Sequence, residues 1–191
     1  MKSKIFKSRI MVFLVIFAVF IVAMVAYSSM SGKKTASTVK VLLITTMGNI
    51  TIELFDDMPI TAGNFKNLVQ QGTYDGTIFH RVVPNFVVQG GDPTGTGQGD
   101  PNIPSIQDEL PNKHSNTVGT LAMANKGPNT GSSQFFINLK DNSADLDSNY
   151  PVFGKVVEGI DVVDSIGKVP TNSTSERPLQ DVILTKAELI G

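Results

Sequence analysis

The chain has 191 residues, of which 41% are hydrophobic and 17% charged, and its formal net charge is -1. It contains no cysteine, which excludes a disulfide scaffold, a thiol nucleophile, a cysteine-based zinc site and an iron–sulfur cluster. With only two histidines, a histidine-rich metal site is also disfavoured. These averages conceal a division between a basic, apolar leader and an acidic remainder.

The leader contains an apolar segment long enough to cross a membrane. Residues 10–27 are eighteen consecutive apolar residues, and as a helix with a rise of ~1.5 Å per residue they span roughly 27 Å. Four basic residues precede this segment and two follow it, which favours an N-terminus inside the cell. We therefore predict a basic leader and transmembrane anchor over residues 1–27, and a flexible linker over residues 28–37. The domain of residues 38–191 is then extracytoplasmic.

Two alternatives remain for this segment. A cleaved signal peptide would have a shorter apolar region, but Ala26-Tyr27-Ser28 suits a cleavage site, and cleavage would make the domain a secreted one. A buried core helix is the third interpretation, and it is the least favoured because core helices are seldom apolar on all sides over this length.

Residues 38–191 have the size of one domain and a negative charge. The leader and linker hold six of the sixteen basic residues and no acidic one, so the domain holds ten basic against seventeen acidic residues, a net charge of -7. This balance argues against a nucleic-acid binder, which needs a basic face. The length of 154 residues allows one core of substantial size.

The predicted elements of the domain are mostly short strands. β-rich runs at 39–46 and 50–55 flank Met47-Gly48-Asn49 and predict a hairpin. Helices are predicted over 59–71 and over 159–166. Further strands are predicted at 78–83, 86–89, 119–123, 134–139, 152–157 and 181–189. Many short strands with two separate helices favour a closed antiparallel barrel. The long segment 90–111, rich in Gly and Pro, is typical of a functional loop.

Several motifs lack the context that their chemistry requires. Gly95, Gly97 and Gly99 open no helix, which argues against a nucleotide site. Ser132-Ser133 lies in no complete Gly-x-Ser-x-Gly elbow, which argues against serine hydrolase chemistry. The alternating acids between residues 141 and 147 lack the Gly and Glu of a calcium loop, so a solvated turn is the prediction there. Asn49 and Asn172 begin glycosylation sequons whose use depends on the host.

Residues 79–92, FHRVVPNFVVQGGD, are the most informative stretch of the domain. On one extended strand, Phe79 and Arg81 would share a face and His80 would point the other way; after the turn, Val87 and Gln89 would share a face. One surface then gathers an arginine, an amide and apolar side chains. A charge among apolar neighbours needs acceptors. The stretch therefore predicts either a functional arginine or a strand arginine held by a structural acid.

Four blocks in chain order resemble the cyclophilin-type peptidyl-prolyl cis-trans isomerases. They are residues 79–92, 121–125 (LAMAN), 127–137 (GPNTGSSQFFI) and 152–161 (VFGKVVEGID). Residues 106–125 are most similar to the compact prokaryotic branch. The resemblance implies a mainly β fold, a closed eight-stranded antiparallel barrel with two helices, whose interior is packed core and whose site lies on the outer surface. It implies isomerase activity on X–Pro peptide bonds without a cofactor or metal.

The resemblance also assigns roles to residues. Arg81 matches the catalytic arginine of the family. The substrate-binding positions are Phe86, Val87, Gln89, Ala124, Asn125, Gln134, Phe136, Leu146 and Tyr150. Asp145 stands where the family often has Trp, and Tyr150 where it often has His. The absence of Trp at Asp145 implies weak cyclosporin binding at most. Tyr150 in place of His keeps a ring and a polar tip at the pocket rim.

The sequence thus predicts a membrane-tethered isomerase that acts on proline-containing, exported polypeptides and binds no nucleic acid. No oligomerisation stripe is present, so we expect a monomer. The alternative is a non-catalytic module or holdase that binds proline-containing segments on the same fold, which the altered wall at Asp145 and Tyr150 would permit.

Overall fold

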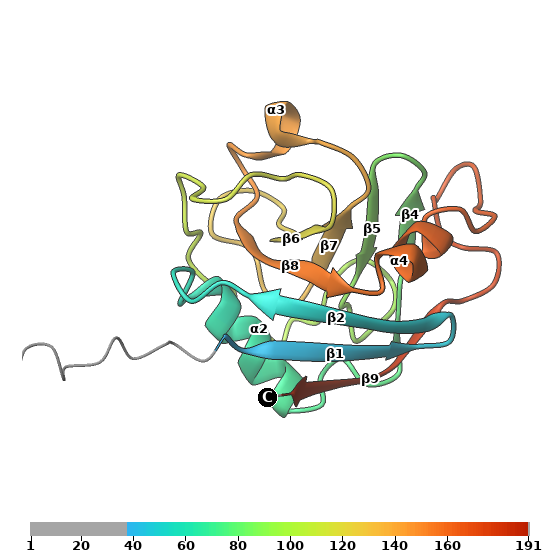
Figure 1. The fold of residues 1–191 in the computed structure, drawn as a ribbon, viewed down its shortest axis with the longest axis horizontal. Helices are drawn as coiled ribbons and strands as arrows, with labels where there is room; N and C mark the ends of the chain where they lie inside the picture. Colours follow the sequence, from blue (N-terminus) through green and yellow to red (C-terminus); the bar gives the residue numbers. More distant parts are fainter. Residues whose placement is uncertain (1–37, 191) are drawn as a thin grey trace, which may run out of the picture. The chain divides into compact units, whose positions relative to one another are not determined.

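The computed structural model describes residues 38–190, which form a mainly β domain with few helices (Figure 1). The strands are β1 (Lys40–Thr45), β2 (Gly48–Leu54), β3 (Thr77–Ile78), β4 (Arg81–Val83), β5 (Val87–Gly90), β6 (Thr120–Met123), β7 (Phe135–Asn138), β8 (Val152–Glu158) and β9 (Ile183–Ile190). The helices are α2 (Thr61–Gln70), α3 (Ser143–Leu146) and α4 (Ile160–Ile166). All nine strands belong to one antiparallel sheet in the order β3-β9-β1-β2-β8-β6-β7-β5-β4.

The prediction of a closed eight-stranded barrel is wrong in strand number and in closure, since the sheet has nine strands. The sheet is curled but only half-closed, because its two end strands, β3 and β4, form no ladder with each other among residues 38–190. The predicted single strand 78–83 is split at Phe79 and His80: β3 pairs with β9, whereas β4 pairs with β5. Phe79 and Val82 are both buried in the core. Strict alternation cannot place residues three apart on one face, so the strand has to break between them.

The beginning and the end of the domain meet in the sheet. β1 pairs with β2 through a tight turn, as the hairpin prediction required, and also with β9, the last strand. The three strands lie side by side in Figure 1. Gly48 opens β2 with φ of +133°, and an added Cβ would come within 2.8 Å of Val162 in α4. Only glycine fits both the backbone and this close helix contact.

Helix α2 confirms the prediction over 59–71, but its first turn depends on a distant residue. The Glu109 carboxylate accepts hydrogen bonds from the backbone N–H groups of Ile60 at 3.1 Å and Thr61 at 2.7 Å. These donors have no partner within the helix, and an acid also suits the positive end of the helix dipole. The other end of α2 is followed by Gly72 with φ of +71°.

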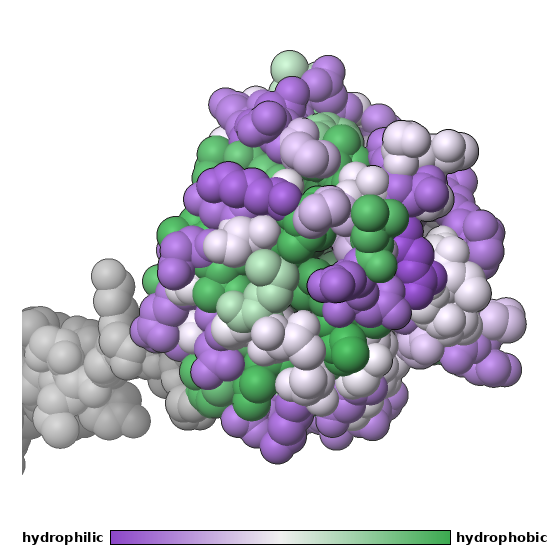
Figure 2. All heavy atoms as spheres, turned by 90° about the vertical axis from the view of Figure 1, so that its right-hand side faces the viewer, coloured by the Kyte–Doolittle hydropathy of each residue, from purple (hydrophilic) through white to green (hydrophobic). Residues whose placement is uncertain are grey.

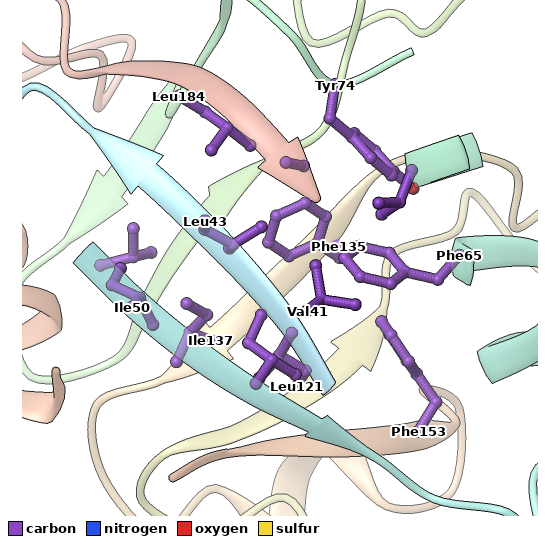
Figure 3. Packing of buried hydrophobic residues seen from close by; sticks show 14 of the residues in the cluster. Val41, Leu43, Ile50, Phe65, Tyr74, Leu121, Phe135, Ile137, Phe153 and Leu184 are labelled. Atoms are coloured by element: carbon purple, nitrogen blue, oxygen red, sulfur yellow. The ribbon is translucent and has the colours of Figure 1, made fainter. Parts of the chain in front are cut away.

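The core lies inside the curled sheet and under α2 (Figure 3). Phe135 of β7 lies at its centre, with its ring centroid 5.3 Å from Phe65, 5.7 Å from Tyr74 and 6.5 Å from Phe79. All three contacts are edge-on, which is a favourable geometry for aromatic rings. The packed interior agrees with what the family resemblance implied.

The helices differ from the predictions at α3, and one predicted helix lies outside residues 38–190. The short helix α3 was missed, because its four residues are too few to show helical periodicity and none is buried. No helix within residues 38–190 is long and apolar enough to cross a membrane. The predicted hydrophobic helix at residues 10–27 lies outside the described residues.

Candidate functional site

A second apolar cluster lies on the sheet face opposite the core, and we call it the outer cluster. It is built on residues that alternate with core residues along β5, β6, β7 and β8. Its buried members are Val87, Ala122, Phe136 and Val152, and Phe55, Phe86, Ala124, Leu146 and Tyr150 pack against them while partly exposed. An apolar cluster that remains partly open to solvent can receive an apolar group.

The wall of the outer cluster comes from the segment around α3. The Tyr150 ring meets Phe136 edge-on, with 5.6 Å between ring centroids. Leu146 closes α3 through a backbone hydrogen bond to Asn142, and Tyr150 in turn bonds to Leu146. Tyr150 therefore supplies a ring at the rim, as predicted. Asp145 is exposed on the same short helix.

Asparagine side chains fix this wall to the floor of the cluster. The Asn142 amide donates to the Phe86 carbonyl at 3.0 Å and to Asn138 at 2.8 Å. Asn138 in turn donates to the Asn116 side-chain oxygen at 3.1 Å. The three asparagines are buried, where unpaired amides would be costly. The network therefore ties Phe86 to the segment that carries Leu146.

A line of polar side chains borders the outer cluster. Nε of Arg81 donates to Oε2 of Glu176 at 2.6 Å, and Nη1 donates to Oε1 of Gln89 at 3.4 Å. Gln89 donates to Oε1 of Gln134 at 3.0 Å. The Arg81 guanidinium carbon lies 6.0 Å from the Phe86 ring centroid. The cation is thus held at the rim of an apolar surface by amide and carboxylate oxygens.

The loop after β5 is organised around a buried carboxylate. Oδ2 of Asp92 accepts backbone N–H bonds from Gly97 at 2.7 Å and Gly99 at 3.1 Å, and Oδ1 accepts one from Thr94 at 2.9 Å. Burial alone would raise the pKa of Asp92, but these hydrogen bonds outweigh it, and the pKa is lowered. The glycine-rich segment, which the sequence analysis rejected as a nucleotide site, thus folds around this acid through Gly97 and Gly99. The Gly97 carbonyl accepts from Gln134 at 3.1 Å, so this loop also supports the polar line.

A cavity of about 570 Å³ adjoins the polar line. Four predicted site residues border it: Gln89, Ala124, Asn125 and Gln134. Lys126 reaches across it, and its Nζ donates to the Gln98 carbonyl at 2.7 Å. Sequence reasoning did not single out Lys126 or Gln98, because neither shows a local pattern.

The structure brings all ten predicted site residues into one region. The apolar members belong to the outer cluster, and Arg81, Gln89 and Gln134 form the polar line. Asn125 joins the cavity to the wall, because its amide donates to the Asn149 carbonyl at 2.7 Å. Sequence reasoning also missed Glu176, which lies 95 positions after Arg81 in the chain.

One prediction about side-chain direction is wrong. Phe79 is buried in the core, whereas Arg81 is 35% exposed beside the outer cluster, so the two side chains do not share a face. The break in the strand at Phe79 and His80 is the reason. Val87 and Gln89 do lie on the face that carries the site. Among residues 38–190, no group of three or more histidine and acidic side chains could hold a metal ion.

The chain belongs to the cyclophilin-type peptidyl-prolyl cis-trans isomerases. Residues 40–189 match the family model described as "Cyclophilin type peptidyl-prolyl cis-trans isomerase/CLD". A peptidyl-prolyl cis-trans isomerase-like 1 protein of Gibberella zeae is 44% identical over 157 residues, which cover 80% of this chain and 96% of that protein. The peptidyl-prolyl cis-trans isomerase ppi1 of Schizosaccharomyces pombe is 47% identical over 149 residues, with 76% and 95% coverage.

Solved structures agree with this assignment. A crystal structure of a cyclophilin-type isomerase of Cryptosporidium parvum matches with a TM-score of 0.75 and 33% identity, over 81% of this chain and 98% of that one. A second structure of the same protein, in the presence of the dipeptide Ala-Pro, matches with a TM-score of 0.74. The chain is therefore a peptidyl-prolyl cis-trans isomerase, and the non-catalytic alternative has no support in these comparisons.

Proposed function

We propose that isomerisation takes place where Arg81 borders the outer cluster, with Arg81 as the catalytic residue. The observation that carries this proposal is the position of the guanidinium, 6.0 Å from the Phe86 ring centroid at the rim of the apolar surface. A proline ring seated on that surface would bring its peptide nitrogen within reach of a fixed cation.

The chemistry suits such an arrangement. Rotation about a peptide bond is opposed by a barrier of ~18–20 kcal/mol, because the nitrogen lone pair is delocalised into the carbonyl. At the twisted transition state the nitrogen regains this lone pair and becomes an acceptor. A donor aimed at it binds the transition state better than either ground state, which is the requirement for catalysis. Arg81 supplies such a donor, because a guanidinium carries five N–H donors in a fixed planar arrangement.

The other predicted residues would hold the substrate on either side of the bond. Phe86, Val87, Phe136 and Leu146 supply the apolar surface for the proline ring. The backbone at Ala124 and Asn125 borders both the outer cluster and the cavity, which suits hydrogen bonds to an extended peptide. No bond to the substrate is made, so no nucleophile or cofactor is needed.

Replacement of the arginine tests this proposal. Arg81→Ala should lower kcat/KM for a short X–Pro peptide roughly 100-fold or more, because it removes the donor to the transition state. The rate is measured in a protease-coupled assay with the full chain. Lys186→Ala on β9 removes a cation remote from the outer cluster and serves as the control. Full activity of Arg81→Ala, with an unchanged melting temperature, would refute the assignment.

We further propose that the enzyme is tethered to a membrane through residues 10–27 and acts outside the cytoplasm on exported, proline-containing polypeptides. The support is the apolar segment and its basic flanks. Fractionation of the full chain tests this proposal: it should stay in the membrane fraction at high salt and at alkaline pH. A soluble protein whose sequence begins after residue 27 would instead indicate a cleaved signal and a secreted enzyme.

Three smaller expectations stay predictions. The relatives compared above are eukaryotic, so the similarity to the compact prokaryotic branch is untested. Weak cyclosporin binding at most is expected from Asp145. A monomer is expected because the sequence shows no oligomerisation stripe. Figure 2 shows hydrophobic and hydrophilic side chains interspersed on the face at the right-hand side of Figure 1.

A further inference from the structure

The strongest contact of Arg81 comes from outside the outer cluster. The 2.6 Å distance between its Nε and Oε2 of Glu176 is typical of a charge-assisted hydrogen bond, whereas its 3.4 Å contact with Gln89 is weak. The carboxylate therefore holds the Nε edge of the guanidinium. Within residues 38–190, Nη1 has only the weak bond to Gln89 and Nη2 has no hydrogen bond, so both can meet another acceptor.

The segment between α4 and β9 is folded so that it presents Glu176 to β4. The Glu176 carbonyl accepts from the Val82 backbone N–H at 2.8 Å, and the Glu176 N–H donates to the Asn172 carbonyl at 2.9 Å. A bridge between Thr171 and Pro178 closes this loop at its base. Glu176 is thus bonded through its backbone to the residue that follows Arg81.

Arg177, the residue after Glu176, anchors the loop at two further points. Nη1 of Arg177 donates to the Gly95 carbonyl at 3.1 Å, and Nη2 donates to Asp181 at 3.0 Å. The loop is therefore fixed both to the segment around Asp92 and to the approach to β9. A carboxylate on such a support has a defined position.

Stability does not explain a glutamate at this position. Glu176 has φ of +57°, in the left-handed region where glycine is free of strain and other residues are not. The side chains of Arg81 and Glu176 are 35% and 41% exposed, and exposed ion pairs add little to stability. Backbone strain at a well-supported residue often accompanies function.

We infer that Glu176 is a positioning residue for isomerisation, which fixes the Arg81 side chain so that its terminal amino groups meet the proline nitrogen at the twisted transition state. This inference rests on the proposed function of Arg81. An unrestrained arginine has many rotamers, and a donor must be held in place to act on a short-lived geometry.

Glu176→Gly tests the inference, because it removes the carboxylate and relieves the backbone strain together. We expect kcat/KM to fall roughly 10- to 100-fold, with kcat carrying the loss and KM within about twofold of the original value. The melting temperature should stay the same or rise. A purely structural role predicts the opposite, a lower melting temperature with normal kcat in the folded protein. Glu176→Gln should recover most of the activity, because its amide oxygen can still accept from Nε.

Two parallel variants separate the outcomes. Glu188→Ala removes an exposed ion pair with Lys186 on β9 and should leave the rate unchanged. If Arg81→Ala is inactive but Glu176→Gly is fully active, this inference is overturned and the proposed function stands. If Arg81→Ala is fully active, the proposed function fails, and this inference with it. Loss of activity in Glu176→Gly that is matched by unfolding, without recovery in Glu176→Gln, would also overturn it.

Discussion

The core and the outer cluster are built from the same strands but differ in what they are exposed to. Neighbouring residues on four strands go to opposite sides: Val88 and Val87 on β5, Leu121 and Ala122 on β6, Ile137 and Phe136 on β7, and Phe153 and Val152 on β8, with the core residue named first in each pair. The core is sealed by α2 and by the curl of the sheet. The outer cluster is bordered by partly exposed rings and by a cation.

This difference shows how one sheet provides both stability and function. Alternation along a strand obliges every second side chain to leave the core. In this fold those side chains form an apolar surface, whose exposure is costly unless a ligand uses it. The outer cluster should therefore contribute less to stability than the core and much more to activity.

The sharpest test uses two adjacent rings on β7. Phe135→Ala should lower the free energy of unfolding by about 3–5 kcal/mol, because it leaves a cavity among Phe65, Tyr74 and Phe79. Phe136→Ala should lower the free energy of unfolding by less, because the Phe136 ring faces a surface that is already partly open to solvent. Urea unfolding measures both values.

Activity should show the reverse order. At a temperature where both variants are folded, Phe136→Ala should lower kcat/KM at least tenfold, because the surface for the proline ring is lost. Phe135→Ala should retain most of the wild-type kcat/KM. Equal losses of stability and of activity in the two variants would contradict the division between the clusters.

The asparagine network behind the wall should give an intermediate effect. Asn142→Ala removes the donors to Phe86 and Asn138, and the loss of buried hydrogen bonds should cost about 1–3 kcal/mol of unfolding free energy. Because Leu146 and Phe86 lose their common support, kcat/KM should fall as well. Asn102→Ala, at an exposed asparagine of the long loop, is the matched control and should change neither quantity. If Asn142→Ala changed neither the free energy of unfolding nor kcat/KM, the floor at Phe86 and the wall at Leu146 would be held independently of each other.

The smallest expected effect is the pH dependence of stability that His80 causes. His80 is buried, and neither ring nitrogen has a hydrogen-bond partner within the described residues. Burial lowers the pKa of His80 from its usual 6.5. Below about pH 6.5 the unfolded chain takes up a proton on His80, whereas the folded chain resists protonation there. The stability linked to neutral His80 is therefore fully present above about pH 6.5 and is lost as the pH falls through the folded pKa.

His80→Gln removes this titration. The difference in melting temperature between wild type and His80→Gln should shift in favour of the variant as the pH is lowered from 8 towards 5, about the range in which histidines titrate. The same scan with Lys186→Ala controls for general effects of pH. A constant difference across the range would show that His80 does not titrate differently in the two states.

The sequence by itself determined the parts whose signals are local. Alternation predicted the β1–β2 hairpin and the shared face of Val87 and Gln89, and helical spacing predicted α2. The four family blocks contain eight of the ten predicted site residues, and their catalytic and binding roles stay predictions. These features depend on side chains within a few positions of one another, or on motifs that keep their residues together.

Only the tertiary structure decided the contacts between distant segments. Glu176 meets Arg81 across 95 positions, and Glu109 binds the first turn of α2 across 48, although no local pattern marks either acid. The split between β3 and β4 likewise arises because Phe79 and Val82 must both enter the core. The sequence left open whether Arg81 is functional or held by a structural acid. The fold supplies an acid, Glu176, and we propose that it positions a functional arginine.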